Sequence, residues 1–338
     1  MQQGGGGAGA CRRRTTVGEG VAVATTRKTR SEPAAKLPAH GYPTEHPFNK
    51  DGYRYILADA DPHAPNRQEF DDSQECAGRP IPSYFYRGAV LPRVILAPND
   101  RAAQLKLSDD RMTVTGEKGY CLIRASHCVR SGGWYYEFTV DDMPPETACR
   151  VGWAQAYENL QAPCGYDKFS YSWRSRKGTR FHNSRGRHYS AAYGEGDVLG
   201  CYIYLPELRD PSALVPDTVK DKPLVKFKNY LYYEDQLETQ QVLKSLRPAR
   251  GSRVVFYKNG RCQGTAFVDV HAGCYYPAVS LYRGCTVTVN FGPSFRCPPR
   301  DGVRYRPVSE CATETIAQQT LSDLLFFVEN EGKLTLEL

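Results

Sequence analysis

The feature that most constrains the fold is a stretch of alternating residues between Trp134 and Trp173. Apolar and polar side chains alternate from Trp134 to Val140 and again from Cys149 to Trp153, a period typical of β-strands with one buried face. The side chains expected to face inward are Trp134, Tyr136, Phe138, Val140, Cys149, Val151 and Trp153. Arg150 must then point outward, near the returning segment Tyr166 to Arg174. The sequence therefore predicts a functional surface around Arg150.

Short strands separated by turn signals continue on both sides of this stretch. They are predicted at residues 53–57, 94–96, 105–107, 112–114, 120–124, 177–181, 196–204, 254–264, 276–281 and 285–292. The Asn259-Gly260 pair is a strong hairpin signal. Residues 59–85 look irregular, and residues 206–252 form a long charged insertion with one strand near 224–227. Regular strand spacing without intervening helices favours an all-β sandwich.

Residues 1–38 form a low-complexity basic segment with clusters at Arg12 to Arg14 and Arg27 to Arg30. Because the segment has too little apolar surface to offset the entropy of ordering, we predict that it is disordered. Its positive charge favours contact with phosphates or an acidic surface, and a solvated linker or nuclear-import patch is the simpler interpretation. The net charge of +7 is lower than that of a dedicated nucleic-acid binder.

The sequence lacks the motifs by which catalytic, cofactor and metal sites are usually recognised. G-x-S-x-G, Walker and HExxH patterns are absent. The twelve cysteines never form a C-x-x-C pair, and we interpret them as reduced thiols. No catalytic residue, cofactor or metal site is predicted. Because there is neither a secretory leader nor an apolar run of the ~20 residues that a membrane span needs, a soluble intracellular protein is expected.

A surface rich in Arg and Tyr is the positive signal for function. Arg174, Arg176 and Arg180 follow the segment that ends at Trp173, and Arg185 and Arg187 come soon after. Arg beside Tyr is enriched at binding hot spots, because the guanidinium pairs with carboxylates while the ring supplies rigid contact area. A solvated face is the alternative for the charge run. Arg150 fits that alternative poorly, since it lies inside a strand between small and aromatic residues.

The end of the chain changes to a helical period. Ala317, Leu321, Leu324, Leu325 and Val328 form one apolar stripe, and Phe326 and Phe327 add apolar surface beyond it. One alternative is that the stripe docks on the sandwich of the same chain. The other is that it enters a groove of another protein, as amphipathic helices often do.

The strand motifs resemble those of SPRY domains. They are Trp134-Tyr-Tyr-Glu, Val151-Gly-Trp153, Tyr171-Ser-Trp173, Gly196-Asp-Val-Leu-Gly200, Val255-Phe-Tyr-Lys-Asn-Gly260 and Val289-Asn-Phe-Gly292. Longer motifs are similar to one SPRY family, the Ash-two-like subunits of histone methyltransferase complexes. They are His40-Gly-Tyr-Pro, His46-Pro-Phe-Asn-Lys-Asp-Gly-Tyr-Arg-Tyr-Ile-Leu57, Gly116-Glu-Lys-Gly-Tyr120, Asn159-Leu-Gln-Ala-Pro163 and Gly165-Tyr-Asp-Lys-Phe-Ser-Tyr-Ser-Trp-Arg-Ser175.

The resemblance covers about residues 10–330 and implies a domain organisation. It implies a disordered basic linker over 1–38, a SPRY-type sandwich of two antiparallel sheets over 39–308, and a partner-binding helix over 309–338. The insertion at about 206–252 and the segment Gly332 to Leu338 depart from the family pattern. The family's zinc-finger and winged-helix region does not occur in this sequence, which therefore looks like a truncated form or a fragment.

The resemblance also implies a nuclear, non-catalytic scaffold. Together with the retinoblastoma-binding-protein-five and WD-repeat subunits, members of the family activate a SET-domain enzyme that methylates lysine four of histone three. A basic pocket of the family binds an acidic segment of the retinoblastoma-binding-protein-five subunit. The residues matching that pocket are Tyr120, Arg150, Pro163, Tyr166, Arg174 and Arg176, the last of which replaces a lysine. The strand pattern by itself also points to Arg150, Tyr166 and Arg174.

Two further contacts are implied by the family. The terminal helix resembles one that enters the groove of a dumpy-thirty dimer, and the matching residues are Leu321, Leu324, Leu325 and Val328. Arg12, Arg13 and Arg14 fall where the family has a basic linker motif that contacts nucleosomal DNA, although the two sequences differ. The main alternative function is therefore a nucleic-acid or nucleosome-binding module that uses the basic linker and surface arginines. Recruitment of substrates to a ubiquitin ligase would need an appended module that these residues do not contain.

Overall fold

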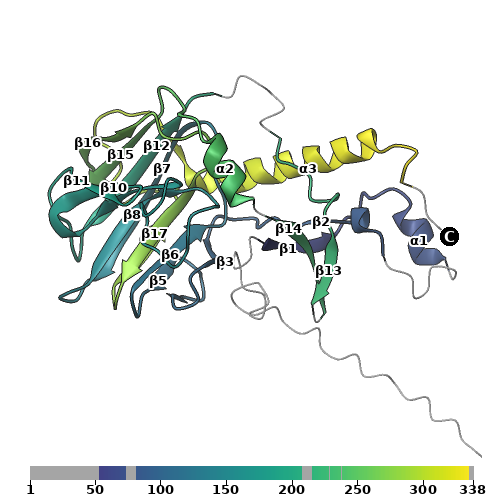
Figure 1. Ribbon diagram of the computed structural model, residues 1–338, viewed down its shortest axis with the longest axis horizontal. Coiled ribbons are helices and arrows are strands. Elements are labelled where there is room, and N and C mark those ends of the chain that lie inside the picture. Colours follow the sequence, from purple (N-terminus) through teal and green to yellow (C-terminus); the bar gives the residue numbers. More distant parts are fainter. Residues whose placement is uncertain (1–52, 74–80, 208–214, 228, 237, 335–338) are drawn as a thin grey trace, which may run out of the picture. The chain divides into compact units, whose positions relative to one another are not determined.

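The computed structural model describes residues 53–73, 81–207, 215–227, 229–236 and 238–334 (Figure 1). Two β-sheets form a sandwich. The first has seven strands in the order β11 (Arg185–His188), β10 (Thr179–His182), β9 (Ser170–Arg174), β8 (Ala148–Ala154), β17 (Tyr276–Tyr282), β6 (Tyr120–Ala125) and β3 (Leu96–Arg101). The second has eight strands: β16 (Arg261–Val268), β15 (Arg253–Lys258), β12 (Val198–Leu205), β7 (Gly132–Asp142), β18 (Thr286–Asn290), β5 (Thr113–Thr115) and β4 (Lys106–Leu107), with β19 (Arg306–Pro307) beside β7. The predicted all-β sandwich with antiparallel sheets is confirmed.

Alternating side chains from both sheets build the core of the sandwich. Trp134 on β7 and Trp153 and Trp173 on the other sheet are at most 2% exposed. Every side chain that was predicted to face inward from β7 and β8 belongs to this one cluster. The predicted inward faces of these two strands are therefore confirmed.

The opposite faces of β7 and β8 are buried as well, so the prediction of an open outer face is wrong. Tyr135 packs with Tyr257 outside the eight-stranded sheet, and Phe295 and Tyr305 lie against its ring. All seven residues of β8 are buried. A period of two distinguishes the two faces of a strand, but segments distant in sequence decide whether the second face stays exposed.

Local signals place the turns better than the short irregular elements. Asn259 and Gly260 join β15 to β16 with φ values of 53° and 76°, as a two-residue hairpin turn requires. The region 59–85, which was predicted to be irregular, contains helix α1 (Arg67–Asp72) and the 3-10 turn η2 (Ser83–Phe85). The sequence pattern misses β11 because Arg-Gly-Arg-His has none of the β-branched residues that favour strands.

A third sheet combines residues that are far apart in the sequence. Its strand order is β13 (Leu224–Phe227), β14 (Tyr230–Gln236), β1 (Tyr53–Ala60) and β2 (Tyr86–Gly88). β13 is the strand predicted within the insertion, whereas β14 and helix α2 (Thr239–Ser245) are missed. Because Tyr53 pairs with Gln236, the insertion completes a sheet that begins before the sandwich.

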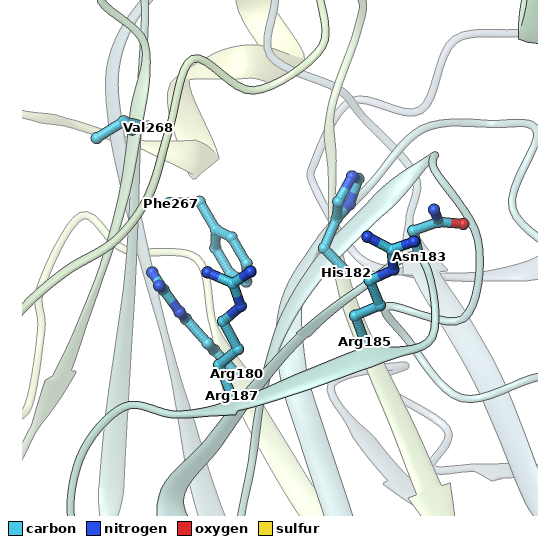
Figure 2. A pocket seen from close by; sticks show the side chains of 7 residues that line it. All are labelled: Arg180, His182, Asn183, Arg185, Arg187, Phe267 and Val268. Carbon is cyan, nitrogen blue, oxygen red and sulfur yellow. The ribbon is translucent and has the colours of Figure 1, made fainter.

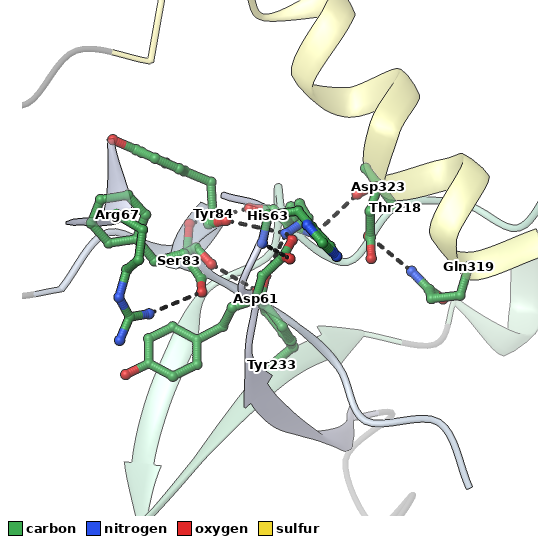
Figure 3. A network of polar contacts seen from close by, with 12 residues as sticks. Asp61, His63, Arg67, Ser83, Tyr84, Thr218, Tyr233, Gln319 and Asp323 are labelled. Atoms are coloured by element: carbon green, nitrogen blue, oxygen red, sulfur yellow. Dashed lines mark hydrogen bonds and ion pairs between the residues drawn. The ribbon is translucent and has the colours of Figure 1, made fainter. Parts of the chain in front are cut away.

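A buried polar network joins this sheet to the last helix (Figure 3). Lys220 is 1% exposed, and its Nζ donates to Asp61 Oδ2 at 2.6 Å and to the Tyr86 carbonyl at 2.7 Å. The ring of Phe327 on the helix lies 4.6 Å from that Nζ. Burial raises the pKa of Asp323, also on the helix, although the charge of Lys220 acts in the opposite direction. The helix therefore contacts the small sheet and its flanking residues through the side that carries Asp323 and Phe327.

Helix α3 (Cys311–Glu329) follows the 3-10 turn η5 (Val308–Glu310) and begins inside the sandwich core, to which Val308, Cys311 and Ala312 belong. Further along, Ser322 and Asp323 are buried. The apolar stripe is exposed: Leu321 by 47%, Leu324 by 51%, Leu325 by 42% and Val328 by 70%. The alternative in which this stripe docks on its own sandwich is therefore wrong.

Some predictions fall on parts of the chain that the structure does not describe. The linker 1–38, with Arg12, Arg13 and Arg14, lies outside the described residues, as does the end of the segment Gly332 to Leu338. No helix within the described ranges has the length and hydropathy needed to span a bilayer.

Candidate functional site

Two neighbouring strands place the arginines of the candidate site side by side. In the antiparallel pair of β8 and β9, Arg150 is directly opposite Arg174. Directly opposite residues point to the same face of a sheet. Both guanidinium groups make cation–π contacts with the ring of Phe181 on β10. The ring centroid lies 3.8 Å from Arg150 Cζ and 5.0 Å from Arg174 Cζ. The sheet register thus places two guanidinium groups side by side against one aromatic ring.

Arg150 is desolvated without being fully paired. Its Nη1 donates to the Cys164 carbonyl at 3.1 Å, and its Cζ lies 5.1 Å from the centroid of the Tyr120 ring. Only 7% of Arg150 is exposed, and its buried Nε has no hydrogen-bond acceptor among the described residues. Burial lowers the pKa of the guanidinium and the charge of Arg174 acts in the same direction, although Tyr120 and Cys164 oppose them. A carboxylate ligand would favour the charged form of the guanidinium by its opposite charge.

A second buried arginine shows what full pairing looks like in this fold. Arg124 on β6 is fully buried, and its Nε and Nη2 donate to the two carboxylate oxygens of Asp100 at 2.7 and 2.5 Å. Its Nη1 donates to the carbonyls of Gln155 and Glu158. Arg150 has no described carboxylate within ion-pair distance. Because Arg124 has a carboxylate partner and Arg150 has none among the described residues, we expect Arg150 to bind a carboxylate from another molecule.

The loop between β8 and β9 forms the next wall of the site. It turns at Pro163, whose carbonyl accepts the amide of Tyr166 at 2.9 Å. Gly165 has φ +86°, and an added Cβ would lie 2.6 Å from the Phe181 carbonyl, so only glycine fits. The buried Glu158 side chain accepts a hydrogen bond from the Gly165 amide at 3.2 Å and so restrains the loop. The ring of Tyr166 is 51% exposed at the rim.

The structure brings most, but not all, of the predicted pocket residues together. Arg150 contacts the rings of both Tyr120 and Phe181, and Arg174 contacts that of Phe181. The turn from Pro163 to Tyr166 adjoins Arg150 through the Cys164 carbonyl. Arg176 lies farther along, on the 3-10 turn η3 (Arg176–Gly178). Its side chain is 55% exposed, and its Nη1 lies 3.9 Å from a Glu146 oxygen. Arg176 is therefore a residue of the rim.

Sequence reasoning missed Phe181 and the Cys164 carbonyl. Phe181 lies in the predicted strand 177–181, between two cationic side chains, but its partners are distant in sequence. The available signal was its alternation with Arg180 and His182, which places Phe181 with Thr179 on the opposite face of the strand. A backbone carbonyl leaves no signal in a sequence. No group of side chains that could hold a metal ion occurs among the described residues.

The chain is similar to several known proteins. A family model described as "SPRY domain" matches residues 133–207 and 246–294. The "Set1/Ash2 histone methyltransferase complex subunit ASH2" of Drosophila melanogaster is 55% identical over 303 residues, which are 89% of this chain and 54% of that protein. The "Set1/Ash2 histone methyltransferase complex subunit ash-2" of Caenorhabditis elegans is 38% identical over 337 residues, 96% of this chain and 57% of that protein. A solved SPRY domain of human HERC1 aligns with 60% of this chain and 99% of its own at 19% identity, with a TM-score of 0.40.

The sandwich and the matching family model define a SPRY-domain protein. Among SPRY proteins the chain belongs with the Ash2-like subunits, which it resembles both inside and outside the SPRY region. It spans about half the length of the curated relatives that it matches.

Proposed function

We propose that this chain is a non-catalytic, nuclear scaffold subunit of a histone methyltransferase complex. Its relatives are named as subunits or components of Set1 or Set1/Ash2 complexes, which supports this coarse assignment. In the finer form implied by the family resemblance, the chain works with a SET-domain methyltransferase and a WD-repeat subunit on lysine four of histone three. Its own contribution is to hold two partners on two separate surfaces.

The first surface binds an acidic segment, which we propose belongs to the retinoblastoma-binding-protein-five subunit. The observation that carries this proposal is the buried Arg150: among the described residues its Nε has no acceptor and its charge has no carboxylate partner. Arg174 adds a second guanidinium on the same face. A carboxylate can accept two parallel hydrogen bonds from such a fork, and the surrounding rings exclude water from the pair.

The second surface is the apolar stripe of α3, for which we propose a dumpy-thirty dimer as the partner. The helix turns its polar Ser322 and Asp323 toward its own chain and leaves Leu321, Leu325 and Val328 exposed. Exposed apolar side chains at this spacing are typical of a helix that lies in a hydrophobic groove. Contact of Arg12, Arg13 and Arg14 with nucleosomal DNA stays a prediction, since these residues lie outside the described part of the chain.

Arg174 and Arg176 should differ in how much each contributes to the affinity for the acidic segment. We expect Arg174→Gln to weaken binding of the acidic segment about tenfold, because this guanidinium contacts the same Phe181 ring as Arg150. We expect Arg176→Gln to weaken it less than about threefold, because an exposed charge at the rim contributes little. Isothermal titration calorimetry of each variant with a synthetic peptide of the acidic segment measures the difference. Equal losses would contradict the assignment of Arg176 to the rim.

A further inference from the structure

A second cationic site lies on the other face of the hairpin that carries Phe181. We propose that the cavity between β10, β11 and the end of β16 binds a compact ligand with two or more phosphate groups. Its volume is about 350 Å³, and its described lining consists of Arg180, His182, Asn183, Arg185, Arg187, Phe267 and Val268 (Figure 2). This volume is in the range of small-molecule sites.

The register of the hairpin concentrates positive charge in this cavity. Arg180 is directly opposite Arg187, and His182 is directly opposite Arg185. Directly opposite residues share one face, and the like charges of Arg180 and Arg187 in that position destabilise a sheet. Burial lowers the pKa of His182, so the positive charge comes from the three arginines. Because side chains alternate along a strand, Phe181 points to the other face, where its ring contacts Arg150. The hairpin therefore separates two cationic sites.

Nothing in the described part of the chain neutralises this charge. The described lining contains no carboxylate, and Arg180, Arg185 and Arg187 form no ion pair with a described residue. Arg180 Cζ lies 5.4 Å from the centroid of the Phe267 ring, which restricts its orientation. In Figure 2, Arg180 and Arg187 lie beside Phe267, whereas Arg185 and Asn183 lie on the side of His182. The cationic groups thus flank one common space.

Phosphate is the anion that suits this arrangement best. Guanidinium groups bind phosphate oxygens through two parallel hydrogen bonds, so three of them can hold more than one phosphate group. The competing explanation is that arginines on β11, an edge strand, only prevent pairing with other chains. That explanation does not require the charges to surround a cavity, and it implies no saturable ligand binding.

The experiment is calorimetric titration of the whole chain with inorganic tripolyphosphate and, separately, inositol hexakisphosphate, at about 0.15 M salt. We expect saturable binding that Arg180→Gln/Arg187→Gln weakens at least tenfold. The matched control is Arg250→Gln/Arg261→Gln, which removes the same charge from exposed positions outside the described lining and should change the affinity less than twofold. Preference for one of the two probes would separate linear polyphosphates from inositol phosphates as the ligand source.

Several outcomes would overturn the proposal. One is the absence of saturable binding to wild type, and another is an equal loss in the control variant, which would indicate attraction to net charge alone. Binding of a phosphopeptide or a DNA duplex through Arg180 and Arg187, without binding of either small probe, would assign the cavity to a macromolecule instead. Thermal unfolding without ligand checks that the variants fold. The Arg180→Gln/Arg187→Gln variant should still bind the acidic peptide, so failure here is distinguishable from failure of the Arg150 site.

Discussion

Replacement of Arg150 by alanine is expected to weaken binding of the acidic segment by about 2 kcal/mol or more, about 30-fold in Kd. The side chain is 7% exposed, so the ligand carboxylate meets a guanidinium that has already lost its water. Phe181 and Tyr120 hold that guanidinium in place before the ligand arrives. Little further ordering is then needed on binding, and most of the interaction contributes to affinity.

The Arg150→Ala variant should still fold. The Cys164 carbonyl that Arg150 contacts also accepts Ser172 Oγ at 2.6 Å, so no buried acceptor is left unpaired. Arg150→Lys is the matched variant: it keeps the charge but loses the planar fork, and we expect an intermediate affinity. Calorimetry with the acidic peptide measures both variants. An affinity within twofold of wild type for Arg150→Ala would exclude this pocket as the binding site.

The double variant Leu321→Asp/Leu325→Asp is expected to abolish binding to a purified dumpy-thirty dimer, with a loss of at least about 100-fold. Each aspartate would have to give up its water inside an apolar groove, which a charged group does only at high cost. Because both leucines are more than 40% exposed, the free chain should keep its stability.

The matched control for the helix is Thr313→Asp/Thr320→Asp. It adds the same two charges at exposed positions of α3 and leaves all the leucines in place. We expect the control to bind the dumpy-thirty dimer nearly as well as wild type in size-exclusion chromatography and calorimetry. Retained binding of the leucine variant would remove the apolar stripe from the interface. Both variants should bind the acidic peptide normally, since the two surfaces use different residues.

Local patterns were sufficient to predict the strands and the direction of their side chains. The alternation from Trp134 to Trp153 identified the buried faces of β7 and β8, and it placed Arg150 on the opposite face. It could not reveal that Phe181 would cover that face, because the pairing of β8 with β9 and of β9 with β10 decides which side chains meet. The sequence pattern therefore predicted the charged residues of the candidate site but not Phe181, the aromatic ring that they contact.

Contacts between distant segments explain the other differences. The pairing of Tyr53 with Gln236 joins residues that no local pattern connects, so the insertion could be predicted only as one isolated strand. The helical period predicted the apolar stripe of α3, but an apolar stripe normally faces its own core. Here Lys220 and Asp61 provide a polar contact surface for the helix, which reverses the usual orientation. Such a buried network depends on tertiary structure.

We propose that the Arg150 and Arg174 pair recognises carboxylates. The most direct test is calorimetric titration of the wild-type chain with the acidic peptide and with the same peptide in which every Asp and Glu is replaced by Asn and Gln. The two peptides have nearly the same shape and differ in charge. We expect saturable binding of the acidic peptide and at least about 30-fold weaker binding of its amide counterpart. Equal affinity for both peptides, or no binding of the acidic one, would exclude recognition of carboxylates by Arg150 and Arg174.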